Sequence, residues 1–300
     1  MKRKGIARAA DWVVAKLLFG TVRLIGLLPI DTALDTAHRM GCLIGPLTPR
    51  HRVVLDNLRT AFPEWDDRRR RGVGREMWGH QARLVVESAL LDRLFDYRPG
   101  LTTGRIEFAD ATSVVERYDG SDPLLLFTAH TGSFELMPMM AKVQGVPLAS
   151  LFRRPNNRFV AERLQTQREK GGGKLVRARK GAAMELAAEL RARRAAAVLV
   201  DQKFRPGTLI EFFGRPALTN PLIARLAALT KGTVYPARCI RLPDNRYRIE
   251  IEEPLVLPRD ERNRIDVDKS LRLVNERVER WVREHPEQWM WFHRRWGNSM

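Results

Sequence analysis

Cysteine is almost absent from this sequence of 300 residues. The two cysteines, Cys42 and Cys239, lie far apart, so a disulfide framework and a CxxC zinc site are both excluded. So few thiols favour a reducing compartment. The sequence also lacks the glycine-rich motifs of phosphate- and dinucleotide-binding loops, and the Gly-x-Ser-x-Gly motif of nucleophile-elbow hydrolases. It therefore predicts neither a metal centre nor a cofactor.

Negative charge is scarce as well. The 35 Asp and Glu residues face 53 Lys and Arg residues, which gives a net charge of +18. Such a positive field favours anionic partners, namely nucleic acid, an acidic protein or anionic lipid head groups. Hydrophobic residues make up 44% of the chain, enough for a sizeable core, so wholesale disorder is excluded.

No long uncharged apolar run is present. The most apolar stretch, Trp12 to Leu28, is interrupted by Lys16 and Arg23, whereas a clean transmembrane helix needs about 20 apolar residues. No cleavage site of the signal-peptide type follows it. Its basic flanks and its tryptophan suit an anionic interface, so we expect a helix that lies in or dips into the membrane at the cytoplasmic face. The alternative is an ordinary amphipathic helix packed on its own domain.

Beyond residue 123 the pattern changes to short apolar runs that alternate with helical periodicity. Strands that alternate with helices predict an α/β fold with a mostly parallel central sheet flanked by helices. We divide the chain into an N-terminal membrane-associating helical segment, residues 1–50, and an α/β domain, residues 51–300. The expected strands are 124–129, 147–152, 195–200, 233–240 and 247–252, the expected helices are 75–91, 182–193 and 266–284, and a solvated turn is expected over 66–71.

Polar residues directly follow the first three expected strands. His130 follows the first, Arg153 and Arg154 follow the second, and Asp201, Gln202 and Lys203 follow the third. In an open parallel sheet the carboxyl ends of the strands line the ligand crevice. We therefore expect these side chains to converge on one site.

The segment from His130 to Glu135 carries the clearest local signal. Gly132 permits a tight turn, Ser133 can cap the next helix, and Glu135 falls in that helix's first turn. The Glu135 carboxylate could then accept a hydrogen bond from one ring nitrogen of His130 and leave the other nitrogen as a base. This arrangement suits removal of a proton from a substrate hydroxyl. Taken alone, the same two residues also fit purely structural roles.

Arg168 and Lys170 lie at the end of an expected helix, before three consecutive glycines. Cations at a helix C-terminus complement its dipole, which is a structural explanation. The functional alternative is recognition of a phosphate or an oxyanion by the arginine fork. The sequence leaves both open.

Six ordered segments together resemble the late acyltransferases of lipid A biosynthesis, the lauroyl and myristoyl acyltransferases of the lysophospholipid acyltransferase superfamily. The resemblance covers nearly the whole chain, including the segment 57–63 and the amino end. The six segments are 130–135, 152–157, 164–168, 201–203, 212–217 and 287–296.

The resemblance implies an enzyme at the cytoplasmic face of a bacterial inner membrane. It would move a fatty acyl chain from an acyl carrier protein thioester to a hydroxyl of a phosphorylated glucosamine lipid, without a cofactor. His130 matches the family's catalytic base and Glu135 its partner carboxylate, while Arg168 and Asp201 match polar residues of the same site. The substrate-binding residues that we expect are Arg153, Arg154, Asn156, Arg168, Asp201, Arg294 and Arg295. The tryptophans near the end, Trp289, Trp291 and Trp296, are expected to pack the last helix onto the sheet.

Three other functions remain open at this stage. An acyltransferase of the same chemistry could act on an amino-acid lipid or a glycosylated phosphoinositide. A nucleic-acid-binding protein would also be basic, but the cations are scattered and no such signature is present, so we expect no nucleic-acid partner. A catalytically silent membrane scaffold is disfavoured by His130 and Glu135.

Overall fold

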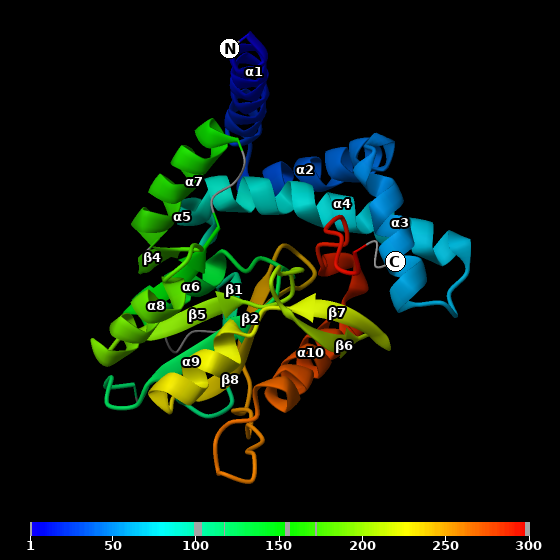
Figure 1. Ribbon diagram of the computed structural model, residues 1–300. Coiled ribbons are helices and arrows are strands. Elements are labelled where there is room, and N and C mark those ends of the chain that lie inside the picture. The colour runs from blue at the N-terminus through cyan, green and yellow to red at the C-terminus, as the bar shows by residue number, and fades with distance from the viewer. Residues whose placement is uncertain (1, 99–103, 117, 154–156, 172, 298–300) are drawn as a thin grey trace.

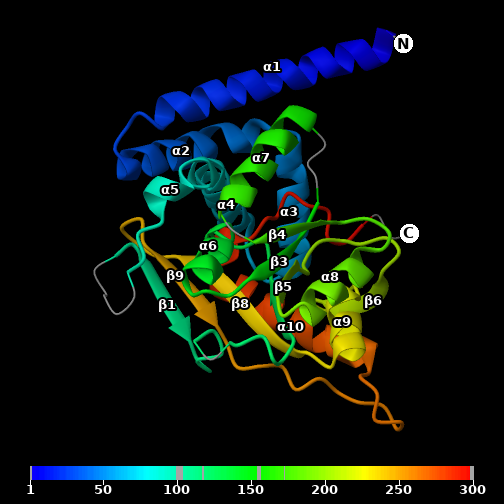
Figure 2. The same cartoon turned by 90° about the vertical axis from the view of Figure 1, so that its left-hand side faces the viewer.

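The fold is a seven-stranded sheet with helices on both faces (Figures 1 and 2). The computed structural model describes residues 2–98, 104–116, 118–153, 157–171 and 173–297. The sheet order is β1-β9-β8-β2-β5-β3-β4, and β8 with β9 is its antiparallel pair. The other neighbours run parallel, so the expected mostly parallel sheet is confirmed. The strands are β1 (Ile106–Asp110), β2 (Leu124–Thr128), β3 (Leu148–Phe152), β4 (Lys174–Arg177), β5 (Ala195–Leu199), β8 (Thr233–Arg241) and β9 (Tyr247–Ile251).

The five expected strands all form, within a residue or so of the expected bounds. The sequence missed β1 and β4, which are short strands at the two edges of the sheet. It also missed the antiparallel hairpin of β6 (Thr208–Phe212) and β7 (Arg215–Thr219), which forms a separate two-stranded sheet.

Helices cover the two faces of the sheet with separate apolar cores. On one face lie α8 (Ala182–Arg191), α9 (Leu222–Thr230) and α10 (Val267–Glu284), packed against alternate residues of β2 such as Leu125 and Phe127. On the other face lies α6 (Leu136–Val143), and Figure 2 shows it across the sheet from α8 and α9. Because β2 is buried on both sides, it reads as a continuous apolar run.

A layer of N-terminal helices contributes side chains to the cores on both faces of the sheet. It contains α2 (Ile30–Ile44), α3 (Arg50–Ala61), α4 (Asp67–Ala89) and the short α5 (Leu91–Leu94), with a 3₁₀ turn (Gly45–Leu47) between α2 and α3. The first helix, α1 (Lys2–Ile25), lies above α2 and contacts α7 (Arg158–Gly171) (Figure 2). Among the described residues, no helix combines the length and apolar character needed to cross a bilayer.

The solvated turn expected over 66–71 is wrong, because these residues begin α4. Asp66 caps the helix by accepting a hydrogen bond from the backbone N–H of Arg69 at 2.6 Å. Arg70 is buried, and its guanidinium donates to the carbonyl oxygens of Phe62 and Pro63. The polar run therefore includes a charged side chain that ties α4 to the end of α3.

Candidate active site

His130 and Asp201 face each other across neighbouring strands. Strands β2 and β5 pair with Thr128 opposite Leu199, and each site residue lies two positions further along. The carboxylate of Asp201 lies 2.8 Å from His130 Nδ1, and the backbone N–H of His130 donates to its other oxygen at 2.9 Å. The parallel register thus brings together two of the polar residues that follow strands.

Asp201 is buried and held as a charged carboxylate. Burial alone raises its pKa, but the charge and hydrogen bonds of His130 outweigh this effect. The indole N–H of Trp289 donates to the same carboxylate at 2.8 Å. Together these partners hold the pKa of Asp201 at about 2. The carboxylate is therefore ionised at neutral pH and fixed on three sides.

This pairing defines the tautomer of His130. A carboxylate accepts, so Nδ1 carries the proton and Nε2 presents its lone pair. The side-chain amide of Gln202 lies 3.2 Å from Nε2, where its N–H group can donate to that lone pair. The imidazole is arranged as a base.

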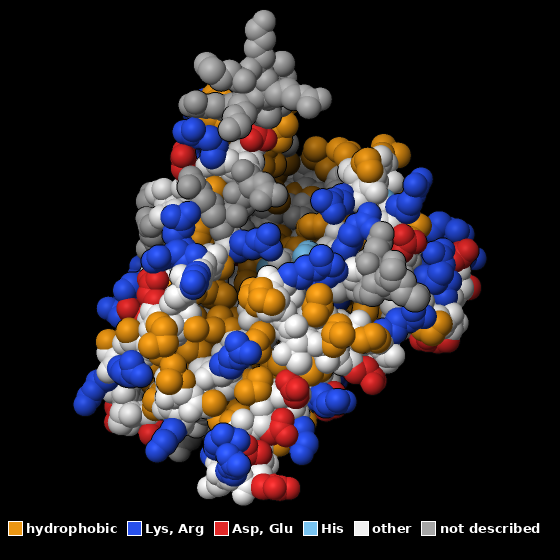
Figure 3. Space-filling model, in the orientation of Figure 1, with side chains coloured by type: hydrophobic (Ala, Val, Ile, Leu, Met, Phe, Trp, Pro, Cys, Tyr) orange, Lys and Arg blue, Asp and Glu red, His pale blue; other side chains and the backbone are white. Residues whose placement is uncertain are grey.

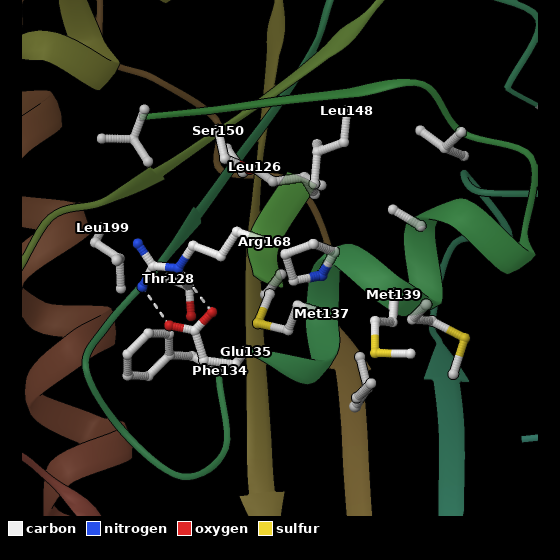
Figure 4. Close-up of a pocket in the computed structure, with 18 of the residues that line it drawn as sticks. Leu126, Thr128, Phe134, Glu135, Met137, Met139, Leu148, Ser150, Arg168 and Leu199 are labelled. Carbon is white, nitrogen blue, oxygen red and sulfur yellow. Dashed lines mark hydrogen bonds and ion pairs between the residues drawn. The ribbon is translucent and has the colours of Figure 1, made fainter. Parts of the chain in front are cut away.

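The expected hydrogen bond between His130 and Glu135 is wrong. Glu135 instead forms a two-pronged ion pair with Arg168 on α7, in which Arg168 Nε lies 3.0 Å from Oε2 and Nη2 donates to Oε1. Figure 4 shows the two side chains turned toward each other. Arg168 also lies over the ring of Phe152, 4.9 Å from its centroid. The sequence suggested a local partner, whereas the fold supplies an arginine from another helix.

An apolar cavity extends from this ion pair between the sheet and α6 (Figure 4). Its volume of about 110 Å³ is several times what one water molecule needs. Methionines contribute strongly to its wall, and such flexible side chains adapt to an apolar guest. Its polar lining includes Glu135, Arg168 and Thr128, and the Thr128 hydroxyl is buried without a hydrogen-bond partner among the described residues. The apolar lining includes Leu126, Phe134, Met137, Met139, Met140, Leu148 and Leu199.

Phe134 links the cavity to the histidine. It lines the cavity, and its ring meets the ring of His130 edge-on with the centroids 5.2 Å apart. His130 itself is not part of the cavity wall. The base and the apolar cavity are therefore neighbours separated by one aromatic ring.

The loop that carries His130 depends on Gly132. Its φ of +56° is in the left-handed region, and a Cβ at this position would lie 1.8 Å from the carbonyl oxygen of Cys239. The predicted tight turn at this glycine is confirmed. The predicted cap by Ser133 is wrong, because its hydroxyl is buried without a described partner and α6 begins only at Leu136.

The C-terminal segment holds this loop from outside. The N–H of Gly132 donates to the carbonyl of Gln288, and the N–H of Met290 donates to the carbonyl of His130. Trp289 and Trp291 are fully buried, so the expected packing role of these tryptophans is confirmed. Trp289 has an additional role that the sequence did not suggest, because its N–H group binds Asp201.

The remaining predicted substrate-binding residues separate into two groups. Arg153 and Arg294 are exposed, and Arg153 is close enough to His293 to affect it electrostatically. Burial lowers the pKa of His293 to about 4, and the positive charge of Arg153 makes a smaller contribution in the same direction. Arg154 and Asn156 lie outside the described residues.

Arg295 differs from the expected phosphate contact. It is fully buried, and its guanidinium donates to the carbonyl of Leu218 and the hydroxyl of Thr219, both at 2.8 Å. It also stacks over Phe212. Its charge therefore anchors the β6–β7 hairpin to the C-terminal segment.

Basic side chains gather around a hollow on the surface of the molecule. Figure 3 shows Lys and Arg side chains on both sides of a hollow with histidine atoms at its floor. A fixed imidazole base next to an apolar cavity, at the carboxyl edge of an α/β sheet, is suited to acyl transfer with a long apolar substrate. The fold and site thus define the class of acyltransferases.

Comparison with known proteins identifies the family. Residues 2–298 match the model of the bacterial lipid A biosynthesis acyltransferases, and the chain belongs to that family. It is similar to the lipid A biosynthesis acyltransferase of Haemophilus influenzae, with 23% identity over 89% of this chain and 82% of the relative. It is also similar to the lipid A biosynthesis myristoyltransferase of Escherichia coli, with 24% identity over 84% of this chain and 77% of the relative. The protein is an acyltransferase of lipid A biosynthesis.

Proposed function

We propose that this enzyme transfers a fatty acyl chain from an acyl carrier protein thioester to a hydroxyl of a phosphorylated glucosamine lipid, with His130 as the general base. The observation that supports this role is the hydrogen bond from His130 Nδ1 to Asp201, which leaves Nε2 as the proton acceptor. Asp201 is the positioning residue in this proposal, in place of Glu135.

The reaction needs one base and no covalent enzyme intermediate. Nε2 takes the proton from the acceptor hydroxyl as its oxygen forms the new bond to the thioester carbonyl carbon. The tetrahedral intermediate then collapses, the C–S bond breaks, and the leaving thiolate takes the proton back from Nε2. Positioned base catalysis of this kind contributes about 10²- to 10⁴-fold in rate. In this scheme the acceptor hydroxyl replaces the Gln202 amide beside Nε2.

The ion pair of Glu135 and Arg168 has a different role in this proposal. Two nitrogens of the guanidinium bind Glu135, and the third, Nη1, has no hydrogen bond among the described residues. Glu135 would hold this donor near the cavity end, where it stabilises the oxyanion of the tetrahedral intermediate. The acyl chain would extend into the apolar cavity behind it. In this proposal Glu135 positions the guanidinium of Arg168, and Arg168 stabilises the oxyanion.

Both proposed substrates are anionic, and the charge of the protein suits them. A net charge of +18 attracts an acidic carrier protein and a phosphorylated lipid at an anionic surface. The exposed Arg153 and Arg294 are the described candidates for phosphate contact.

We also propose that the N-terminal helices bind the cytoplasmic face of the inner membrane. Leu17 and Leu24 of α1 are 67% and 68% exposed. Exposed apolar side chains next to basic ones are typical of helices that lie in a membrane interface. Further large apolar side chains are exposed on the same helical layer: Leu27, Leu43, Ile44 and Leu47.

Lipid analysis tests the function directly. The protein is expressed in cells that lack one late lipid A acyltransferase, and lipids are compared by mass spectrometry for the wild type, His130→Ala and His285→Ala. We expect one added acyl mass on lipid A with the wild type and with the matched control His285→Ala, but not with His130→Ala. If another lipid class gains the acyl mass, that lipid and not lipid A is the acceptor. Full activity of His130→Ala would overturn the mechanism. An assay of the purified protein with an acylated acyl carrier protein as the sole acyl donor tests the identity of the donor.

A further inference from the structure

A cluster of histidine, cysteine and glutamate side chains lies between α2 and α4, on helices that contribute no residue to the His130 site described above. His38 and Cys42 come from α2, and Glu76 comes from α4. His38 Nε2 lies 3.2 Å from Glu76 Oε2, and Cys42 Sγ lies 3.9 Å from both His38 Nε2 and Glu76 Oε1. Three potential metal ligands therefore point at one another.

The helical spacing explains why the three side chains meet. His38 and Cys42 are four residues apart and share one face of α2, and Glu76 and His80 do the same on α4. The two helices pack so closely that a Cβ at Gly79 would lie 2.6 Å from His38 and 2.7 Å from Cys42. The glycine brings the backbone of α4 against the ligand face of α2. The two pairs are thereby held on facing surfaces.

The distances are close to the edge lengths of a metal coordination shell. A tetrahedral zinc ion with bonds of about 2.0–2.3 Å holds its ligand atoms about 3.3–3.8 Å apart. His38 Nε2 lies 3.2 Å from Glu76 Oε2, and Cys42 Sγ lies 3.9 Å from His38 Nε2 and from the other carboxylate oxygen, Oε1, so each separation is about 0.1 Å outside this range. Neither sulfur contact is a strong hydrogen bond, because a thiol is a weak donor. The cluster is thus close to the geometry that zinc requires without rearrangement of the helices.

A second observation points to a missing partner at this place. His80 meets the ring of His38 edge-on, with the centroids 5.3 Å apart. Its Nδ1 is buried and has no hydrogen-bond partner among the described residues. A buried polar atom of this kind normally has a partner, and a water molecule bound to a metal ion beside His38 would supply one.

We propose that His38, Cys42 and Glu76 bind one Zn²⁺ ion that fastens α2 to α4. Imidazole, thiolate and carboxylate are the ligands that zinc takes in proteins, whereas Mg²⁺ and Ca²⁺ prefer oxygen alone. Three protein ligands leave the fourth position to water. A search for CxxC spacing misses such a site, because two of its ligands lie four residues apart on α2 and the third comes from α4.

Cobalt binding to the purified full-length protein without a polyhistidine tag tests the site. After removal of metal with a chelator, Co²⁺ replaces Zn²⁺ as a spectroscopic probe. We expect one Co²⁺ per chain, with the near-ultraviolet charge-transfer band of a thiolate–cobalt bond. Zn²⁺ should displace it and raise the melting temperature of the protein.

Variants separate this site from adventitious binding. Cys42→Ser should abolish the charge-transfer band, whereas the matched control Cys239→Ser should keep it, because Cys239 is buried elsewhere. Glu76→Gln should weaken zinc affinity by at least about 100-fold, more than the loss of an outer-shell partner. Circular dichroism of the metal-free variants checks that they fold. Lack of stoichiometric binding by the wild type, or a band that survives in Cys42→Ser, would overturn the proposal.

Discussion

Asp201 binds His130 twice, through the ring nitrogen Nδ1 and through the backbone N–H. The two contacts use different carboxylate oxygens, so both oxygens of Asp201 are bound by the same residue. A side chain held in this way fixes the orientation and the tautomer of the imidazole together. The pair is the structural basis of the mechanism proposed above.

Asp201→Asn should therefore lower kcat by about 10²- to 10⁴-fold, the range that a positioned base contributes. An amide can donate to Nδ1, which places the proton on Nε2 and removes the basic lone pair from the substrate side. Substrate binding should change little, so KM stays within about threefold of the wild-type value. Steady-state kinetics with an acylated acyl carrier protein as donor check this. A kcat equal to that of the wild type would contradict the assigned role.

The same residue predicts a pH dependence of stability. Its pKa is about 2 in the folded protein, below the ordinary value of 3.8, because His130 and Trp289 outweigh the cost of burial. The ionised form is thus favoured by folding, and this contribution is present above pH 3.8 and lost as the pH falls from 3.8 toward 2. It amounts to about 2 kcal/mol. Urea unfolding between pH 5 and pH 3 should show a steeper loss of stability for the wild type than for Asp201→Asn.

Glu135→Gln distinguishes the role of Glu135 from that of Asp201. Because Glu135 binds Arg168, its substitution should lower kcat by loosening the guanidinium, and Arg168→Ala should lower it by about 10²- to 10³-fold, as for an oxyanion donor. Neither change removes the bond between His130 and Asp201. The pH–rate profile of Glu135→Gln should keep the wild-type shape, while that of Asp201→Asn should not. A shifted profile for Glu135→Gln alone would restore Glu135 as the partner of His130.

Local patterns predicted the strands but not the pairing inside the site. The apolar runs that became β2, β3 and β5 have clear ends, so the sequence placed polar residues at one edge of the sheet. Which of them touch depends on the order of the strands, and β2 lies beside β5 only because of long-range packing. Glu135 is close to His130 in sequence, and this proximity favoured the wrong partner. Arg168 comes from a helix whose position no local pattern reveals.

Burial of charged residues was the other property that local sequence did not show. Arg295 was expected at a phosphate, yet it is enclosed by the β6–β7 hairpin, which the sequence did not predict. Arg70 was expected in a solvated turn and instead caps the end of α3. In both cases a backbone carbonyl oxygen from another element accepts a hydrogen bond from the guanidinium. Such partners are set by tertiary contacts, so composition alone assigns these arginines to the surface.

Gly132→Ala should destabilise the loop that carries His130. Its left-handed φ and the overlap of a Cβ with the carbonyl of Cys239 act together. Gly145→Ala is the matched control, because Gly145 has a φ of +73° but no atom within 4 Å of a Cβ. The control should lose only the strain of a left-handed alanine, about 1 kcal/mol, and the Gly132 variant clearly more. Urea unfolding and acyl transfer check both, and equal losses would show that the close approach does not matter.

Leu17→Glu should weaken binding of the protein to anionic vesicles, because it places a negative charge on the exposed apolar side of α1. Leu209→Glu is the matched control, since Leu209 is 64% exposed and belongs to β6 and not to the N-terminal helices. Both substitutions remove one exposed leucine, so only their position differs. Loss of the contact area of one leucine and repulsion from anionic lipid should reduce the partition coefficient by at least about tenfold for Leu17→Glu. Sedimentation with vesicles of phosphatidylethanolamine and phosphatidylglycerol measures this; equal binding of the two variants would mean that α1 does not contact the bilayer.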